Sequence, residues 1–132
     1  MENKQRLLYE YAMVRYVPCI ERGEFINIGL IMMCKRAKWI KAQFVINKER
    51  VLALCPDADL DTLNIQIEGI IKVADGDNSK KADSISSLTE VHERFRWLTA
   101  VKSASIQTSR PHVGLCGDLD DTFNRLFNTL IK

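Results

Sequence analysis

Six polar residues of this 132-residue chain have the types expected of an anion-binding cluster. They fall in two segments far apart in the sequence, and they are Arg15, Arg22, Glu24 and Asn27 in the first and Gln107 and His112 in the second. An arginine presents a forked pair of donors that matches a carboxylate or a phosphate, and amide side chains fix the orientation of a bound group. Because Glu24 is the only carboxylate of the set, the cluster favours an anionic ligand over a cation.

The same residues also allow an interpretation without a ligand. Glu24 can pair with Arg15 or Arg22 at the end of a hairpin, and charged hairpin ends are commonly solvated and paired. A binding site and a structural network therefore both fit the residue types, and the surrounding elements decide where these side chains lie.

Residues 11–17 and 25–34 are predicted to be two antiparallel strands joined by the charged loop. Antiparallel counting from the loop places Arg15 opposite Asn27 and Met13 opposite Gly29 on one face. A glycine in mid-strand has three interpretations. Gly29 lets a ligand or another backbone approach, it makes room for Met13, or it marks a bulge. The residues predicted to form the other, core face are Ala12, Val14, Tyr16, Ile26, Ile28, Leu30 and Met32.

The face opposite this predicted core face is also partly apolar. Tyr11, Met13, Ile31 and Met33 fall on it by strict alternation, and they need a second helical layer or the surface of a partner. A flat apolar surface here indicates a protein partner, whereas a closed pocket indicates a small-molecule site.

The rest of the chain predicts an α+β fold with an antiparallel sheet of about four strands. Residues 39–46 complete a three-stranded meander, residues 103–109 add a late strand, and helices are expected mainly on one face. Asn47, Asp59 and Asp118 are the predicted N-caps of helices over 48–54, from 60 to about 75 and from 119 to 130. Ser87 and Glu90 have the spacing of a capping box for a further helix up to residue 98. If the late strand adds beside the first, Gln107 reaches Arg15 and His112 lies just beyond the strand end.

Composition predicts one domain over residues 1–132, with a mobile internal loop at 76–84. A chain with 46% hydrophobic and 27% charged residues is long enough for one core and too short for two. The formal charge of +2 is too small to indicate nucleic-acid binding, and the basic turn around Arg36 is typical of a solvated hairpin end. No segment has the pattern of a signal peptide or of a membrane span, so a cytoplasmic location without membrane contact is expected.

No cofactor or metal is expected from the sequence. The two histidines are twenty residues apart, and the cysteines show no CxxC spacing, so neither disulfides nor zinc are predicted. Phosphate-binding loops, nucleophile elbows and kinase signatures are missing from the sequence, which argues against a familiar class of enzyme without excluding catalysis.

Two segments, YAMVRYVPCIERGEFINIGLIMM and RFRWLTAVKSASIQTSRPHVG, resemble the signature segments of the domain of unknown function 3037 family of uncharacterised bacterial proteins. Cys19 stands where the family commonly has an acidic residue. The resemblance implies no activity, but it implies a setting, because relatives tend to be encoded beside HipA-like kinases. The positions that match the family pattern are Arg15–Pro18, Arg22–Glu24, Asn27, Gly29, Ser105–Thr108 and His112.

Two functions follow as expectations. The first is a small binding or accessory module, with a HipA-like kinase as a possible protein partner. The alternative is a small-molecule enzyme or sensor that binds an anionic ligand at the cluster of Arg15, Asn27, Gln107 and His112.

Overall fold

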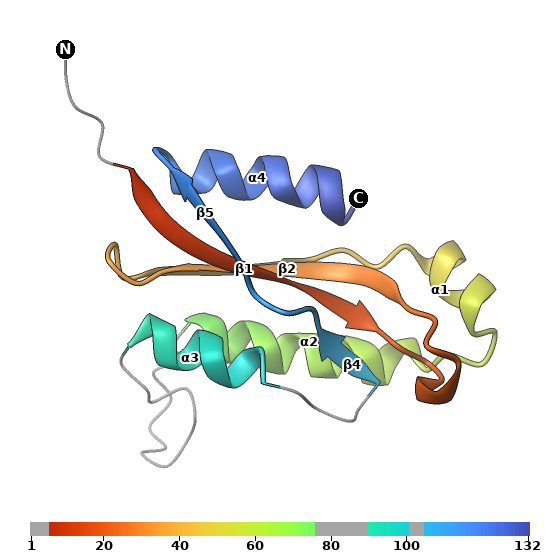
Figure 1. Cartoon of the computed structure of the whole chain (residues 1–132). Coiled ribbons are helices and arrows are strands. Elements are labelled where there is room, and N and C mark those ends of the chain that lie inside the picture. Colours follow the sequence, from red (N-terminus) through yellow and green to blue (C-terminus); the bar gives the residue numbers. More distant parts are fainter. Residues whose placement is uncertain (1–5, 76–89, 101–104) are drawn as a thin grey trace.

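The computed structural model describes residues 6–75, 90–100 and 105–132 (Figure 1). These residues form an antiparallel sheet of five strands, four α-helices and one short 3-10 helix, which confirms the predicted α+β class. The predicted mobile loop at 76–84 lies outside the described residues. The elements are β1 (Leu7–Tyr16), η1 (Ile20–Arg22), β2 (Ile26–Cys34), β3 (Trp39–Phe44), α1 (Lys48–Leu54), α2 (Leu60–Asp75), α3 (Val91–Leu98), β4 (Ile106–Thr108), β5 (His112–Cys116) and α4 (Leu119–Leu130).

The sheet has the order β3-β2-β1-β4, and β5 pairs with another part of β1. β4 lies along the last residues of β1, from Val14 to Tyr16, whereas β5 lies along its first residues, from Leu7 to Tyr11. Within the late strand expected at 103–109, the structure has β4 at Ile106–Thr108. β5 begins after Pro111, whose ring removes a backbone donor, and it was not predicted. Helices α2 and α3 cover one face of the sheet and α4 covers the other (Figure 1).

Three of the predicted N-caps are present, and the one expected at Ser87 lies outside the described residues. Asn47 Oδ1 accepts a hydrogen bond from the amide of Arg50 at 3.1 Å, and Asp118 Oδ1 accepts one from Asp121 at 2.9 Å. Asp59 caps α2 through the amide of Thr62, and the Thr62 hydroxyl also donates to its carboxylate. These hydrogen bonds hold the pKa of Asp59 below its ordinary value.

β2 contains a bulge that reverses its alternation. Val14 lies opposite Gly29 and Arg15 opposite Asn27, so Ile28 is an extra residue without a partner in β1. The prediction that Met13 lies opposite Gly29 is wrong, since Met13 pairs with Leu30. The prediction that Arg15 lies opposite Asn27 is confirmed, because both residues lie between the bulge and the loop.

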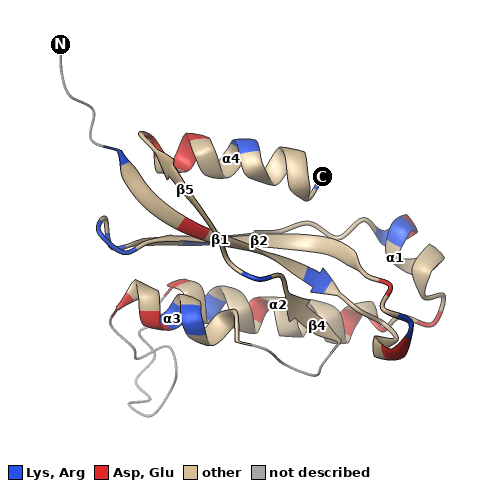
Figure 2. Ribbon diagram, viewed as in Figure 1, with Lys and Arg blue, Asp and Glu red and all other residues tan. Residues whose placement is uncertain are grey.

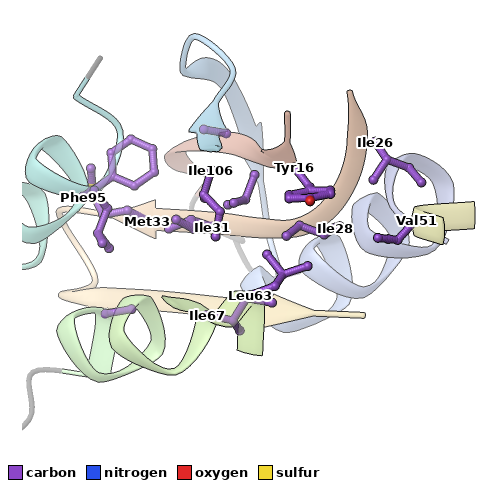
Figure 3. Packing of buried hydrophobic residues seen from close by; sticks show 14 of the residues in the cluster. Tyr16, Ile26, Ile28, Ile31, Met33, Val51, Leu63, Ile67, Phe95 and Ile106 are labelled. Atoms are coloured by element: carbon purple, nitrogen blue, oxygen red, sulfur yellow. The ribbon is translucent and has the colours of Figure 1, made fainter. Parts of the chain in front are cut away.

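The bulge divides the apolar residues of β2 between two cores. Ile28, Ile31 and Met33 pack with residues of α2 and α3, including Leu63 and Phe95 (Figure 3). After the bulge, Leu30, Met32 and Cys34 turn to the opposite face and pack with residues of α4. The expectation that Leu30 and Met32 share a face with Ile28 was therefore wrong.

The second apolar face is covered by a helix of the same chain. Tyr11 and Met13 pack at the core that α4 completes with Phe123, Phe127 and Ile131. Ile31 and Met33, expected on this face, belong to the core on the other side. Of the two alternatives for this face, a helical layer is present, and these residues offer no flat apolar surface to a partner.

Gly29 is expected to resist substitution because the side chain of a neighbouring strand fills the space beside it. A Cβ atom at Gly29 collides with the ring of Phe44, its partner on β3. We expect Gly29→Ala to lower the free energy of unfolding by about 1–3 kcal/mol, as other overpacked substitutions do. The measurement is a urea denaturation curve, and the cost should shrink in a Phe44→Ala background.

Gly69→Ala is the matched control for this substitution. Gly69 lies within α2, and a Cβ there meets no atom within 4 Å. Alanine should raise the helix stability by about 0.5–1 kcal/mol at such a position. Equal effects of the two substitutions would contradict the close contact between Gly29 and Phe44.

Candidate functional site

Three of the six predicted site residues form one row across the sheet. Arg15 of β1 lies opposite Asn27 of β2 on one side and opposite Gln107 of β4 on the other. Side chains at directly paired positions point to the same face, and here this is the face that carries α4. The structure thus confirms that a late strand adds beside β1 and sets Gln107 next to Arg15 in the ladder.

Arg15 is held against an aromatic ring. Its guanidinium carbon lies 4.2 Å from the centre of the Phe25 ring, within the range of a cation–π contact. Phe25 is 46% exposed, so the stacked pair lies at the surface near the end of the hairpin. Nothing in the sequence singles out Phe25, although its position two residues before Asn27 places it near Arg15 in the hairpin.

Two polar atoms of the row are buried without a hydrogen-bond partner among the described residues. They are Arg15 Nε and Asn27 Oδ1, on directly opposite residues. A buried donor or acceptor without a partner costs about 1–3 kcal/mol. Such a cost is more typical of a functional site than of a network that serves stability alone.

Asn27 also links the sheet to α4. Its Nδ2 donates to the carbonyl of Leu130 at 3.4 Å, and it lies 3.7 Å from the sulfur of Met13. The Leu130 carbonyl belongs to the last turn of α4, where carbonyls have no partner within the helix. Asn27 therefore has a structural role beside any role in binding.

Arg22 and Glu24 pair with each other at the hairpin end. Arg22 Nε and Nη2 donate to the two carboxylate oxygens of Glu24 at 3.0 and 3.2 Å, and this hydrogen bonding raises the pKa of Arg22. Gly23, with φ of 71°, closes η1 between them. Because both side chains are largely exposed, this pair fits the turn-end network for Arg22 and Glu24, and it leaves Arg15 outside that pair.

His112 lies apart from the row. It pairs with Tyr11, four residues before Arg15 on β1, which corresponds to roughly 13 Å along a strand. Its ring packs on Tyr11 with centroids 5.2 Å apart, and the residue is exposed. The structure thus brings Arg15, Asn27 and Gln107 together, and it places His112 on the same face beyond direct contact.

A small cavity of about 190 Å³ lies beside Asn27. Arg50 of α1 and Lys132 supply basic side chains at its wall, and Asn47 lies next to them. Figure 2 shows basic positions both at the end of β1 and along α1. The sequence does not single out Arg50, because only the folded chain brings α1 next to Asn27.

Other chemistry is sparse in the part of the chain that the structure describes. No group of three or more His, Cys, Asp or Glu side chains there has the arrangement of a metal site. Cys19, Cys34, Cys55 and Cys116 are free thiols. Among the described helices, none combines the length and the apolar character that crossing a bilayer requires.

Comparison with known proteins identifies a family. The model of the family described as "Protein of unknown function (DUF3037)" matches residues 11–131. The chain belongs to the DUF3037 family. This match confirms the resemblance seen in the two signature segments, and it covers all of the row from Arg15 to Gln107. No curated protein and no solved structure matches the chain.

The link between Asn27 and α4 predicts a measurable loss of stability. We expect Asn27→Ala to lower the free energy of unfolding by about 0.5–1.5 kcal/mol, the usual net contribution of one hydrogen bond. Amide hydrogen exchange in the last turn of α4 should accelerate as well, because its carbonyl loses a donor.

Asn64→Ala, at an exposed position of α2, is the control for the loss of an asparagine. It should leave stability within about 0.5 kcal/mol of the parent. If Asn27→Ala has no larger effect and α4 exchanges as before, Asn27 does not anchor the helix.

Proposed function

We propose that this DUF3037 protein is a small binding module that recognises an anionic group, a carboxylate or a phosphate, through Arg15. The observation that carries this proposal is the state of the Arg15 side chain. It is half-buried, stacked on Phe25 and outside every ion pair that the described residues form.

Stacking prepares Arg15 for binding. A guanidinium held on an aromatic ring keeps its plane fixed, so less side-chain entropy is lost when its donors engage a carboxylate or phosphate. The neighbouring donors supply orientation, with Asn27 and Gln107 on either side of Arg15 in the same row. Arg50 and Lys132 beside Asn27 add positive charge to this end of the sheet.

The comparison with Arg22 supports a special role for Arg15. Both arginines lie near the hairpin end, yet Arg22 has a bidentate carboxylate partner in Glu24. An exposed, internally paired arginine has little left to offer a ligand. Arg15 keeps its terminal donors for an external group.

Binding fits this geometry better than catalysis. The residues opposite Arg15 are amides, which orient a ligand but do not exchange protons at neutral pH. His112, the histidine predicted for the site, packs on Tyr11 farther along β1. An enzyme at this site would therefore need an acid or base from outside the row of Arg15, Asn27 and Gln107.

Two sources of an anionic group suit Arg15. One is a phosphate-containing metabolite, and the other is an acidic segment of a protein partner, for which a HipA-like kinase is the candidate that the family setting suggests. The chemistry of recognition is the same in both cases, namely a forked donor that meets two oxygens.

The test is a thermal melt with a panel of anions. Inorganic phosphate, pyrophosphate, citrate and a short polyglutamate peptide separate the two sources. A ligand at a hundred times its dissociation constant adds about 2.7 kcal/mol, which moves the melting temperature by several degrees in a domain of this size. Arg15→Ala should abolish the shift, and Phe25→Leu should reduce it because the guanidinium loses its support.

Arg36→Ala is the matched control, since Arg36 is an exposed arginine in the turn between β2 and β3. It should leave the shift unchanged. A melting temperature that no anion moves at millimolar concentration would overturn the proposal, as would a full shift in Arg15→Ala.

A further inference from the structure

The outer edge of β5 is open among the described residues. β5 pairs with β1 along one side, and no described strand lies along its other side. Its sequence, HVGLC, contains no Lys, Arg, Asp, Glu or Pro, and Figure 2 shows the strand without charged positions. Charges and prolines are the usual means by which proteins protect a strand edge from pairing.

An apolar patch accompanies this edge. Leu8 is 57% exposed, Val113 is 63% exposed and Leu115 is 54% exposed. Leu8 lies opposite Leu115 in the ladder, and Val113 is two residues from Leu115, so all three lie on one face of the β1–β5 pair. One further strand with an apolar face would pair with the backbone groups of this edge and cover its aliphatic side chains.

We propose that a second copy of this chain supplies that strand. Two β5 strands pair antiparallel about a two-fold axis that passes through Gly114. A two-fold interface brings the same surface of both copies together, so the edge must be complementary to itself. In this register Val113 of each copy lies opposite Leu115 of the other, and the two apolar patches become continuous.

Charge complementarity supports the same register. Counting outward from Gly114 places Arg110 of each copy opposite Asp118 of the other. Both residues are exposed, and neither has an ion-pair partner among the described residues. Asp118 caps α4 through Oδ1, which accepts from Asp121, and Oδ2 is left for an arginine.

Other registers are less favourable. An axis through Val113 sets Leu115 against Pro111, and an axis through Leu115 sets Val113 against Gly117. Either shift loses apolar contacts. At the proposed axis, Gly114 carries no side chain and Tyr9 covers it from the core side, where a Cβ would lie 2.5 Å from the Tyr9 hydroxyl oxygen. At the axis itself, no side chain therefore stands between the two backbones.

The oligomeric state in solution tests this proposal. A short strand edge with a few aliphatic side chains is a small interface, so the dimer should dissociate in roughly the micromolar range. Sedimentation velocity of the full chain from about 5 µM to about 500 µM should show a monomer that converts to a dimer. A monomer throughout this range would overturn the proposal.

Substitutions at the edge locate the interface. Val113→Lys and Leu115→Lys place a charge on the proposed interface and should raise the dissociation constant at least tenfold. Ile65→Lys is the matched control, because Ile65 is 68% exposed on α2, away from β5, and it should leave association unchanged. A dimer that Val113→Lys leaves intact is not formed by this edge.

The register has its own measurement. In a mixture of isotope-labelled and unlabelled chains, filtered NOEs should connect the Val113 methyls of one copy with the Leu115 methyls of the other. Arg110→Glu should weaken association several-fold at low salt, whereas Arg36→Glu should not. NOEs that are stronger between the two Val113 residues than between Val113 and Leu115 would contradict the axis at Gly114. All of these readouts are independent of Arg15, so anion binding and association stand or fall separately.

Discussion

β2 buries apolar side chains on both of its faces, and the bulge at Ile28 determines which of them face each core. The strand lies between β1 and β3, with α2 and α3 on one side and α4 on the other. The extra residue lets Ile28 face the first core and Leu30 the second, although strict alternation puts them together. The residue after the bulge is glycine because the ring of Phe44 occupies the space that a side chain at position 29 needs.

The same bulge separates the row of Arg15, Asn27 and Gln107 from the apolar part of β2. Asn27 lies on the loop side of Ile28, so its position opposite Arg15 depends on the hairpin end rather than on the rest of β2. Bulges are common beside functional sites because they re-aim side chains without disturbing the sheet. α4 then closes the face, and its last turn meets Asn27, which couples the row to the second core.

Local signals made much of the fold predictable. Asn47 and Asp118 precede apolar periodicity and cap their helices as expected, and the pairing of Arg15 with Asn27 follows from counting around a short hairpin. Period-two counting cannot register an added residue, so it failed beyond Ile28. β5 was missed because a five-residue segment with a central glycine has little strand signal of its own, and its pairing partner lies about a hundred residues earlier. Two features of the site also could not be predicted, because they depend on how the folded elements pack. They are the contact of Arg15 with Phe25 and the approach of Arg50 to Asn27.

The most direct test of this account is the environment of the β2 methyl groups after the bulge. In a methyl-labelled sample, Leu30 and Met32 should show NOEs to the aromatic rings of α4, and Ile31 and Met33 should show NOEs to side chains of α2 and α3. An uninterrupted strand would instead give NOEs from Leu30 and Met32 to α2 and α3. That result would contradict the bulge, the second core and the position of the row beside them.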